Sequence, residues 1–333
     1  MKKQHIRGTH IEACPLVLGT DYYGKTIPED TAYSLIETFC QKGGNIIDTA
    51  HVYSDYLPGE KHMSEKVIGR WLRQSCKDKE LGKSLYIATK GGFPEVGDMH
   101  ASRLSYEEVK QDLEESLECL QINSIDLYWL HRDNTAIPAD EIVGWMDEFV
   151  KTGKIKSYGV SNWTAERIKE ARKAAELQKN TAPVASQIRW SMAVTEKATR
   201  EDDTLVEMDP PEYEYYKNND MAVFAFSSQA KGFFAKLKKE GGAYIKPEGK
   251  AGARYFNEQN IKTYEKLQKL SQKYGISEMQ LALAWLTYAP FPAFPIIGCK
   301  STAQLEDSMK TLEYCSLGDN VIGEFKAQYK ESD

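Results

Sequence analysis

The sequence lacks the cysteine pattern of a metal-binding or disulfide-stapled protein. Its six cysteines include no CxxC pair and are scattered at Cys14, Cys40, Cys76, Cys119, Cys299 and Cys315. A structural metal site or a dense disulfide framework needs cysteines at short, regular spacing. We therefore expect reduced thiols, several of them in the core, no metal site, and a cytoplasmic location.

Excess basic charge and long apolar runs are also missing. The formal net charge is −6, and an acidic surface argues against nucleic acid, whose phosphates need a basic footprint. No apolar stretch approaches the roughly 18 residues that span a membrane. The opening MKKQHIRGTHIEAC has no apolar segment of a signal peptide. We expect a small-molecule partner, with neither nucleic acid nor membrane involved.

A glycine-rich GxGxxG fingerprint is absent after every predicted strand, which weighs against an open dinucleotide-binding sheet. Instead, short apolar runs alternate with helical patterns, as in a parallel sheet buried on both faces. The runs cover residues 15–20, 45–50, 84–90, 124–131, 155–162, 183–191, 221–228 and 294–300. This pattern predicts an α/β fold, a parallel eight-stranded (β/α)8 TIM barrel formed by residues 1–333 as a single domain. A doubly wound open sheet is the alternative.

Helix signals separate the strands. Pro28 opens the first helix, Ser64 is a predicted N-cap of the second, and Ser105 with Glu108 forms a capping-box pattern. Segment 228–256 is rich in Gly, Lys and Ala, and we expect a loop there. The other predicted helices cover 138–154, 164–178, a short piece near 209–219, 257–274, 277–288, 301–312 and 317–330.

Side chains that follow the strands of such a barrel meet at its C-terminal rim, where active sites lie. Asp48, Tyr53, Lys90 and His131 end or closely follow strands two, three and four. Each alone has a plainer interpretation, since Asp48 is typical of a turn, and Lys90 and His131 are typical of exposed loops. On consecutive strands, the four together predict a catalytic site.

The chemistry of this set suits protonation of a carbonyl oxygen. A tyrosine phenol is a weak acid near neutral pH, and a nearby ammonium lowers its pKa. Asp48 would hold that ammonium, and a histidine would orient the carbonyl or pass a proton. The set lacks a Ser-His-Asp pattern, and it needs a hydride source to complete a reduction.

Six motifs, in order and on the expected strands, resemble the aldo-keto reductase superfamily over nearly the whole chain. They are NIIDTAHVY, YIATKGG, IDLYWLHR, KIKSYGVSNW, VFAFSS and PIIGCKS. The resemblance implies a barrel that binds a nicotinamide cofactor in extended form without a Rossmann domain. It also implies NAD(P)H-dependent reduction of an aldehyde or ketone to an alcohol.

Residue by residue, the resemblance makes Tyr53 the general acid, Lys90 the group that lowers its pKa, Asp48 the partner of Lys90, and His131 the residue that orients the carbonyl. Ser161, Asn162 and Gln187 would hold the nicotinamide carboxamide, and Trp190 would stack on its ring. Ser161 and Asn162 are equally typical of a helix cap, and Trp190 of a core. The remaining cofactor-binding residues would be Gly19, Thr20, Asp48, Ser227, Gln229, Gly298, Lys300, Ser301, Gln304, Asp307 and Ser308.

The sequence departs from the family pattern where the adenosine end would bind. Gln304 stands where NADP-binding members often carry arginine, and Asp307-Ser308 replaces a Glu-Asn pair. Lys300 still offers a point charge to a 2′-phosphate, so NADP(H) is favoured over NAD(H). Lys231 would add charge near the pyrophosphate.

Aromatic and polar side chains around the mouth favour a keto sugar or sugar aldehyde, and hence a role in carbohydrate metabolism. The predicted substrate-binding residues are Tyr22, Tyr23, Tyr53, Phe93, His131, Arg132 and Trp163. The main alternative is a cofactor-sensing, non-catalytic regulatory subunit of the same fold. A lyase that uses Lys90 as a Schiff base is the third hypothesis. Either a monomer or a small homo-oligomer is compatible with the sequence.

Overall fold

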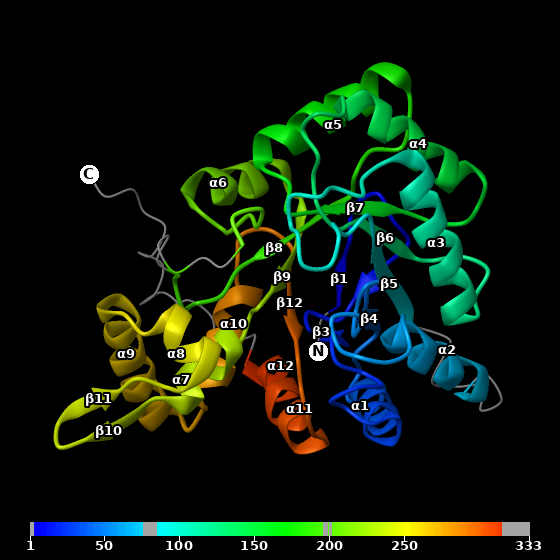
Figure 1. Cartoon of the computed structure of the whole chain (residues 1–333). Helices are drawn as coiled ribbons and strands as arrows, with labels where there is room; N and C mark the ends of the chain where they lie inside the picture. The colour runs from blue at the N-terminus through cyan, green and yellow to red at the C-terminus, as the bar shows by residue number, and fades with distance from the viewer. Residues whose placement is uncertain (1–2, 76–84, 196–198, 200–201, 315–333) are drawn as a thin grey trace.

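The computed structural model describes residues 3–75, 85–195, 199 and 202–314 (Figure 1). Eight parallel strands close into a barrel in the order β12-β3-β4-β5-β6-β7-β8-β9. The predicted (β/α)8 fold class is therefore confirmed, and each strand overlaps its predicted range. The strands are β3 Val17–Gly19, β4 Ile46–Asp48, β5 Tyr86–Gly91, β6 Leu127–Leu130, β7 Tyr158–Ser161, β8 Ala185–Arg189, β9 Ala222–Phe226 and β12 Ala293–Ile297.

Helices follow the barrel strands in turn and cover the outside of the barrel (Figure 1). Neighbouring helices pack against one another, α2 on α3, α4 on α5, and α11 on α1, so the last helix of the barrel meets the first. They are α1 Glu29–Gln41, α2 Met63–Ser75, α3 Tyr106–Leu120, α4 Ala139–Lys151, α5 Ala165–Gln178, α6 Pro210–Asn219, α9 Glu258–Tyr274, α10 Glu278–Thr287, α11 Thr302–Met309 and α12 Thr311–Tyr314.

Side-chain caps set several helix starts. The Ser105 hydroxyl accepts the Glu108 amide at the start of α3, as predicted, and Thr164 accepts the Arg167 amide at the start of α5. The predicted N-cap Ser64 is wrong, because α2 already begins at Met63. Ser64 instead donates to the carbonyl of Thr20, which ties the start of α2 to the loop after β3.

The barrel interior is filled by alternate residues of each strand, since successive side chains in a strand point to opposite faces. The inward set forms an apolar cluster that includes Ile46, Ala88, Trp129, Ala185 and Phe224. The outward residues form a larger cluster between the barrel and its helices. An inward residue beyond the last apolar one therefore points into the C-terminal mouth of the barrel.

Two segments differ from the prediction. Residues 4–13 form a hairpin of β1 Gln4–His5 and β2 Glu12–Ala13, whose Ile6 and Ile11 belong to the apolar cluster inside the barrel. The loop expected over 228–256 contains η2 Ala230–Gly232, α7 Phe233–Lys236, the β10 Lys238–Glu240 and β11 Ala243–Ile245 hairpin, and α8 Gly249–Tyr255. That hairpin projects at the lower left of Figure 1.

The segment folds because apolar residues are interspersed among its lysines. Phe233, Phe234 and Tyr255 are buried in the outer core. The helix predicted over 317–330 lies outside the described residues. Of the helices in the described ranges, none is both long and apolar enough to cross a membrane.

Candidate active site

Five predicted site residues continue the inward-facing rows of five consecutive strands at the C-terminal mouth. Asp48 follows inward Ile46 on β4, Lys90 follows Ala88 on β5, and His131 follows Trp129 beyond β6. Ser161 and Gln187 take the same position on β7 and β8, where the two residues are neighbours in register. Alternation along the strands therefore gathers these polar groups in one layer above an apolar barrel interior.

Lys90 is the centre of this layer. Its Nζ lies 2.5 Å from Asp48 Oδ2, 2.7 Å from the carbonyl oxygen of Thr49 and 2.9 Å from the Tyr53 hydroxyl. Only 1% of the Lys90 and Asp48 surfaces is exposed, so the ion pair is closed to water. Three acceptors use all three hydrogens of the ammonium, which fixes its position.

Tyr53 lies above Lys90 on the loop between β4 and α2. It is half-buried, with Lys90 Nζ 4.5 Å from its ring centroid and the His131 ring edge-on at 6.1 Å between centroids. The loop thus brings a phenol, an ammonium and an imidazole to the same point. The predicted catalytic four lie together.

Burial dominates the proton affinities of these groups. Burial lowers the pKa of Lys90 below its ordinary value, and the adjacent Asp48 carboxylate opposes that shift. Burial, followed by the charges of Asp48 and Asp21, raises the pKa of Tyr53 well above its ordinary value. The net direction is therefore opposite to the predicted lowering, because burial and the nearby carboxylates dominate over the opposing charge of Arg132.

The environment of His131 favours the neutral imidazole. Burial, then the charges of Arg132 and Lys90, lowers its pKa well below the ordinary value. Its Nδ1 has no hydrogen-bond partner among the described residues, and Phe93 packs edge-on against the ring at 4.7 Å between centroids. A buried polar atom without a partner is costly, so this nitrogen is suited to meet a ligand.

A hydrogen-bonded set of amide and hydroxyl side chains lies beside the Lys90–Asp48 ion pair. Gln187 Nε2 donates to Asp48 Oδ1 at 2.9 Å, and the Ser161 hydroxyl donates to the Gln187 carbonyl oxygen at 2.9 Å. Asn162 Nδ2 donates to Ser161 Oγ at 3.0 Å. Asn162 has a left-handed backbone, with φ of 58°, which asparagine tolerates better than most residues and which clusters at functional sites.

The predicted substrate-binding residues separate into two groups. Phe93 and Arg132 lie beside His131, and the Arg132 guanidinium stacks 5.2 Å from the Phe93 centroid while pairing with Asp202 at 3.2 Å. Tyr22 is 37% exposed at the mouth and packs edge-on against Tyr56.

Tyr23 and Trp163 form the second group. Tyr23 is completely buried, and Trp163 is 1% exposed beneath the Arg167 guanidinium. Their burial weighs against direct contact with a substrate.

Trp190 lies in the outer core. It follows outward-facing Ile188, is 3% exposed, and packs against Tyr213, Trp285 and Phe291. This position favours the core interpretation of Trp190 over contact with a ring in the barrel mouth.

Phe226 is the aromatic residue that the sequence interpretation missed. It continues the inward row of Ala222 and Phe224 to the C-terminal end of β9, where it is half-buried and pairs in register with Arg189. The sequence signal for Phe226 is an aromatic residue at the end of a predicted strand, directly before Ser227 and Ser228. Alternation of side chains along that strand then predicts that the Phe226 ring points into the barrel mouth.

The predicted cofactor residues on the first and last barrel strands lie close together. Gly19 on β3 approaches β12 so closely that an added Cβ would lie 2.8 Å from Ile296. Gln229 links the segment after β12 to α11, since its Oε1 accepts a hydrogen bond from the Gly298 amide and its Nε2 donates one to the Ser308 hydroxyl. Thr20, whose hydroxyl donates to the Asp48 carbonyl oxygen, is buried. Ser227 has a left-handed backbone with φ of 54°.

The N-terminus of α11 carries the other predicted cofactor residues. Lys300 is exposed, Ser301 caps the helix, and Gln304 Oε1 accepts the Lys300 amide at 2.9 Å. Asp307 accepts Gln280 Nε2 from α10 at 2.7 Å, so its carboxylate joins two helices. Lys300 and the helix start thus remain the parts of this set most open to a ligand.

The family model described as Aldo/keto reductase family matches residues 15–330. An uncharacterized oxidoreductase of Bacillus subtilis, YrpG, is 27% identical over 317 residues, which are 94% of this chain and 91% of that protein. The aldo-keto reductase yakc [NADP(+)] of Schizosaccharomyces pombe is 27% identical over 275 residues, 79% of this chain and 74% of that protein. A probable aldo-keto reductase 1 of Glycine max is 27% identical over 299 residues, which are 88% of this chain and 78% of that protein.

Proposed function

This chain belongs to the aldo/keto reductase family, and on that premise we propose that it reduces an aldehyde or ketone to an alcohol, with Tyr53 as the proton donor. The observation that carries the proposal is the contact of Lys90 Nζ with both the Tyr53 hydroxyl and the Asp48 carboxylate, at 2.9 and 2.5 Å. A phenol hydrogen-bonded to a fixed, buried ammonium loses its proton to form a phenolate beside a positive charge.

The residues of this site divide the work of the reaction. Tyr53 keeps its proton at neutral pH because burial raises its pKa, and it gives that proton to the carbonyl oxygen. Lys90 stabilises the phenolate that remains, and neutral His131 orients the carbonyl by a hydrogen bond. A bound nicotinamide cofactor would supply hydride to the carbonyl carbon, and the carbonyl oxygen would take the Tyr53 proton, so that an alcohol would result.

The residues around the mouth fit a nicotinamide group. Gln187, Ser161 and Asn162 present amide and hydroxyl groups suited to a carboxamide, and they are already locked to one another. Phe226, rather than Trp190, would offer its face to the ring, because it points into the mouth. The unpartnered His131 Nδ1 adds a polar atom that a ligand in the mouth would satisfy.

Several cations favour a phosphate-bearing cofactor. Desolvation lowers the pKa of Lys231, the Asp21 carboxylate opposes that shift, and repulsion from Arg254, Lys250 and Arg189 adds to it, so these charged groups lie near one another. A pyrophosphate would relieve that repulsion. Lys300, beside the N-terminus of α11, would meet a 2′-phosphate, where the helix dipole also favours an anion. NADP(H) is therefore the expected cofactor. The backbone at exposed Gly298 is open to a ligand, since a Cβ added there would meet no atom within 4 Å.

For the substrate, we expect a keto sugar or sugar aldehyde. Phe93 and Tyr22 supply aromatic faces at the mouth, and Arg132 lies beside His131. A hydroxylated substrate fits such a mixture of ring faces and charged donors better than a wholly apolar one.

The test is loss of NADPH absorbance with a panel of aldehydes and keto sugars, using wild type and Tyr53→Phe. The variant should lose at least about 10²-fold in kcat, the usual contribution of a positioned acid, while binding NADPH with unchanged affinity. Tyr86→Phe is the matched control, because that hydroxyl lies at the other end of β5, 3.4 Å from the carbonyl oxygen of His10. Full activity in Tyr53→Phe would exclude Tyr53 as the acid.

Two other outcomes would redirect the assignment. Tight NADPH binding by wild type without turnover of any carbonyl would favour the regulatory-subunit alternative. Borohydride trapping of a substrate on Lys90 would favour Schiff-base chemistry, although an ammonium that donates to three acceptors is a poor amine nucleophile.

A further inference from the structure

A second cluster of chemically active side chains lies behind the catalytic loop. His51 belongs to the loop between β4 and α2, His62 immediately precedes α2, and Glu115 lies on α3. His51 is buried, and the other two are half-buried. None of the three has a role in the proposed reduction.

The ligand atoms of this cluster converge. His51 Nε2 lies 2.6 Å from Glu115 Oε2, and His62 Nε2 lies 3.7 Å from the same oxygen. One nitrogen from each ring and one carboxylate oxygen all lie within 4.8 Å of one another. The two imidazoles stack, with ring centroids 3.9 Å apart.

The opposite nitrogen of each ring faces an acceptor. His62 Nδ1 lies 2.8 Å from the His51 carbonyl oxygen and 3.2 Å from Asp55 Oδ2. His51 Nδ1 lies 3.6 Å from Asp112 Oδ1. Metal-binding histidines nearly always have such an acceptor on the second nitrogen, which fixes the tautomer and turns Nε2 toward the metal. His62 has this arrangement, whereas the 3.6 Å between His51 Nδ1 and Asp112 is just beyond hydrogen-bond distance.

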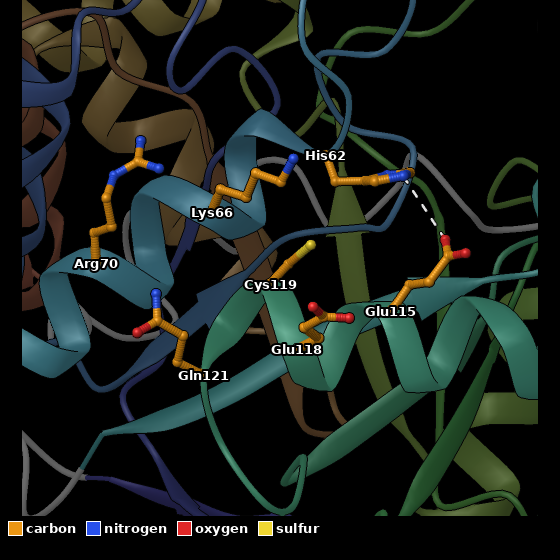
Figure 2. Close-up of a pocket in the computed structure, with 7 residues that line it drawn as sticks. All are labelled: His62, Lys66, Arg70, Glu115, Glu118, Cys119 and Gln121. Atoms are coloured by element: carbon orange, nitrogen blue, oxygen red, sulfur yellow. Dashed lines mark ion pairs between the residues drawn. The ribbon is translucent and has the colours of Figure 1, made fainter.

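A pocket opens beside the cluster, between α2 and α3. It has a volume of about 450 Å³, and Figure 2 shows His62 and Glu115 on its wall with their ion pair dashed. The pocket gives solvent a path to His62 and Glu115, and it has room for a water ligand.

The lysine and arginine that line the pocket do not make it an anion-binding site, because both are already paired with carboxylates. Lys66 Nζ pairs with Glu60 at 2.7 Å, and Arg70 pairs with both oxygens of Glu29 at 2.8 and 2.6 Å. Their charges are therefore largely balanced. The carboxylates of Glu115 and Asp55 face the two imidazoles, which suits a cation, whereas Asp112 is already paired with Arg103 at 2.8 Å.

We propose that His51, His62 and Glu115 form a binding site for a divalent transition metal of the zinc type. Two imidazoles and one carboxylate, with water from the pocket in the fourth position, make up a common zinc ligand set. Bonds of about 2.0–2.1 Å in a tetrahedron place ligand atoms roughly 3.4 Å apart. The observed 2.6 and 3.7 Å separations from Glu115 need shifts of under about 1 Å in that side chain. The two stacked rings must also turn out of their stacked arrangement, so that a nitrogen lone pair of each points to the ion.

The site joins the catalytic loop to the outer helices. His51 stands between Asp48 and Tyr53 in the sequence, and its amide donates to the Lys90 carbonyl oxygen at 3.0 Å. A metal that links His51 and His62 to Glu115 on α3 would fix both ends of the segment that carries Tyr53. Because a ligand that binds only the folded state stabilises it, zinc should also raise the melting temperature.

The direct experiment is calorimetric titration of the full-length, chelator-treated protein with zinc chloride. Wild type should bind one zinc ion, and Glu115→Gln and His62→Ala should each bind at least about tenfold more weakly, as when a metal site loses a supporting group. His100→Ala is the matched control, because His100 pairs with Asp203 at 3.2 Å in a solvent-exposed His–carboxylate pair. That control should bind zinc like wild type.

Two further measurements keep the result interpretable if a variant folds poorly. Melting temperature without zinc reports whether each variant is folded, and anomalous scattering from zinc-soaked wild-type crystals locates the ion without any mutation. An anomalous peak among His51, His62 and Glu115 would support the site. Equal zinc affinity in all variants, no zinc binding by wild type at 100-fold excess, or a peak elsewhere would overturn it.

Discussion

The Lys90 ammonium lies 2.5 Å from the Asp48 carboxylate, although the two residues are 42 positions apart and belong to neighbouring strands β5 and β4. A buried pair of opposite charges is tolerated only when further hydrogen bonds satisfy both groups. Thr49 O and Tyr53 complete the partners of Lys90, and Gln187 Nε2 donates to the other oxygen of Asp48. Asp48 thus controls how firmly Lys90 holds its proton.

Asp48→Asn should lower the pKa of Lys90 further, because the carboxylate that favours the ammonium is removed while burial remains. The alkaline limb of the kcat–pH profile should then move to lower pH. We also expect kcat to fall on the order of 10²-fold, since a less charged Lys90 stabilises the Tyr53 phenolate less well. Steady-state kinetics across a pH series measures both effects.

Asp126→Asn is the control for this variant. Asp126 also pairs with a lysine, Lys156, at 2.8 Å, but it precedes β6 at the opposite end of the barrel. Its removal should cost stability and leave the pH profile unchanged. An unshifted alkaline limb in Asp48→Asn would mean that Lys90 is not the group whose deprotonation limits the rate.

The sequence allowed prediction of the barrel, and of the fact that Asp48, Tyr53, Lys90 and His131 lie together, because both depend on strand position. Asp48, Lys90 and Gln187 end apolar runs, and parallel strands bring their carboxyl ends to one rim. Their contacts follow from the alternation of side chains along each strand and from the register between neighbouring strands. The hairpin of residues 4–13 escaped prediction because its strands are only two residues long.

Other parts of the molecule needed the structure. Trp190 and Phe226 are both aromatics near a strand end, and only the direction of each side chain separates a core residue from a mouth residue. The cluster of His51, His62 and Glu115 depends on how α3 packs against the start of α2, a long-range relationship without a sequence spacing. The Tyr53 pKa depends on burial, which residue types alone do not give.

Lys300→Met tests the cofactor preference. An exposed lysine beside the start of α11 can contribute a charged contact to a 2′-phosphate but none to the hydroxyl of NADH. We expect the KM for NADPH to rise about tenfold, equivalent to about 1.4 kcal/mol. The KM for NADH should stay the same.

Lys310→Met is the matched control, because Lys310 is exposed at the other end of the same helix. It should change neither KM. Parallel increases for NADPH and NADH in Lys300→Met would indicate that Lys300 contacts a part common to both cofactors, and NADP(H) preference would then need another residue.

Asp147 should make the free energy of unfolding depend on pH in the acidic range. Although burial alone raises its pKa, Lys151 and the amide and hydroxyl of Thr181 lower the pKa of this carboxyl below its ordinary value. A carboxyl with a lower pKa in the folded state stabilises the fold above its unfolded pKa of about 3.9, and the effect is lost as pH falls through the folded value. Asp147→Asn should therefore cost about 1 kcal/mol at pH 7 and progressively less below pH of about 4.

Urea unfolding of wild type and Asp147→Asn between pH 7 and 3 measures this difference. Glu37→Gln, which removes an exposed carboxylate on α1, serves as the control and should change stability little throughout. A cost of Asp147→Asn that stays constant with pH would show that the charge of Asp147 contributes nothing.

Gly159 on β7 should be intolerant of any side chain. A Cβ at this position would lie 2.3 Å from the Trp129 ring and 2.7 Å from the Ala185 carbonyl oxygen. Trp129 is completely buried inside the barrel and packs edge-on against Phe224, so it has little room to move. Gly159→Ala should therefore lower the free energy of unfolding by about 3 kcal/mol, at the upper end of overpacking costs.

Gly144→Ala should stabilise the protein, in contrast to Gly159→Ala. Gly144 lies within α4, and a Cβ there would meet no atom within 4 Å. Alanine should raise the free energy of unfolding by about 0.5–1 kcal/mol, because it loses less backbone freedom than glycine in a helix. Denaturant unfolding of the two variants should give shifts of opposite sign. Equal stability of Gly159→Ala and wild type would mean that Trp129 can move, and that the barrel interior is less tightly packed than these contacts indicate.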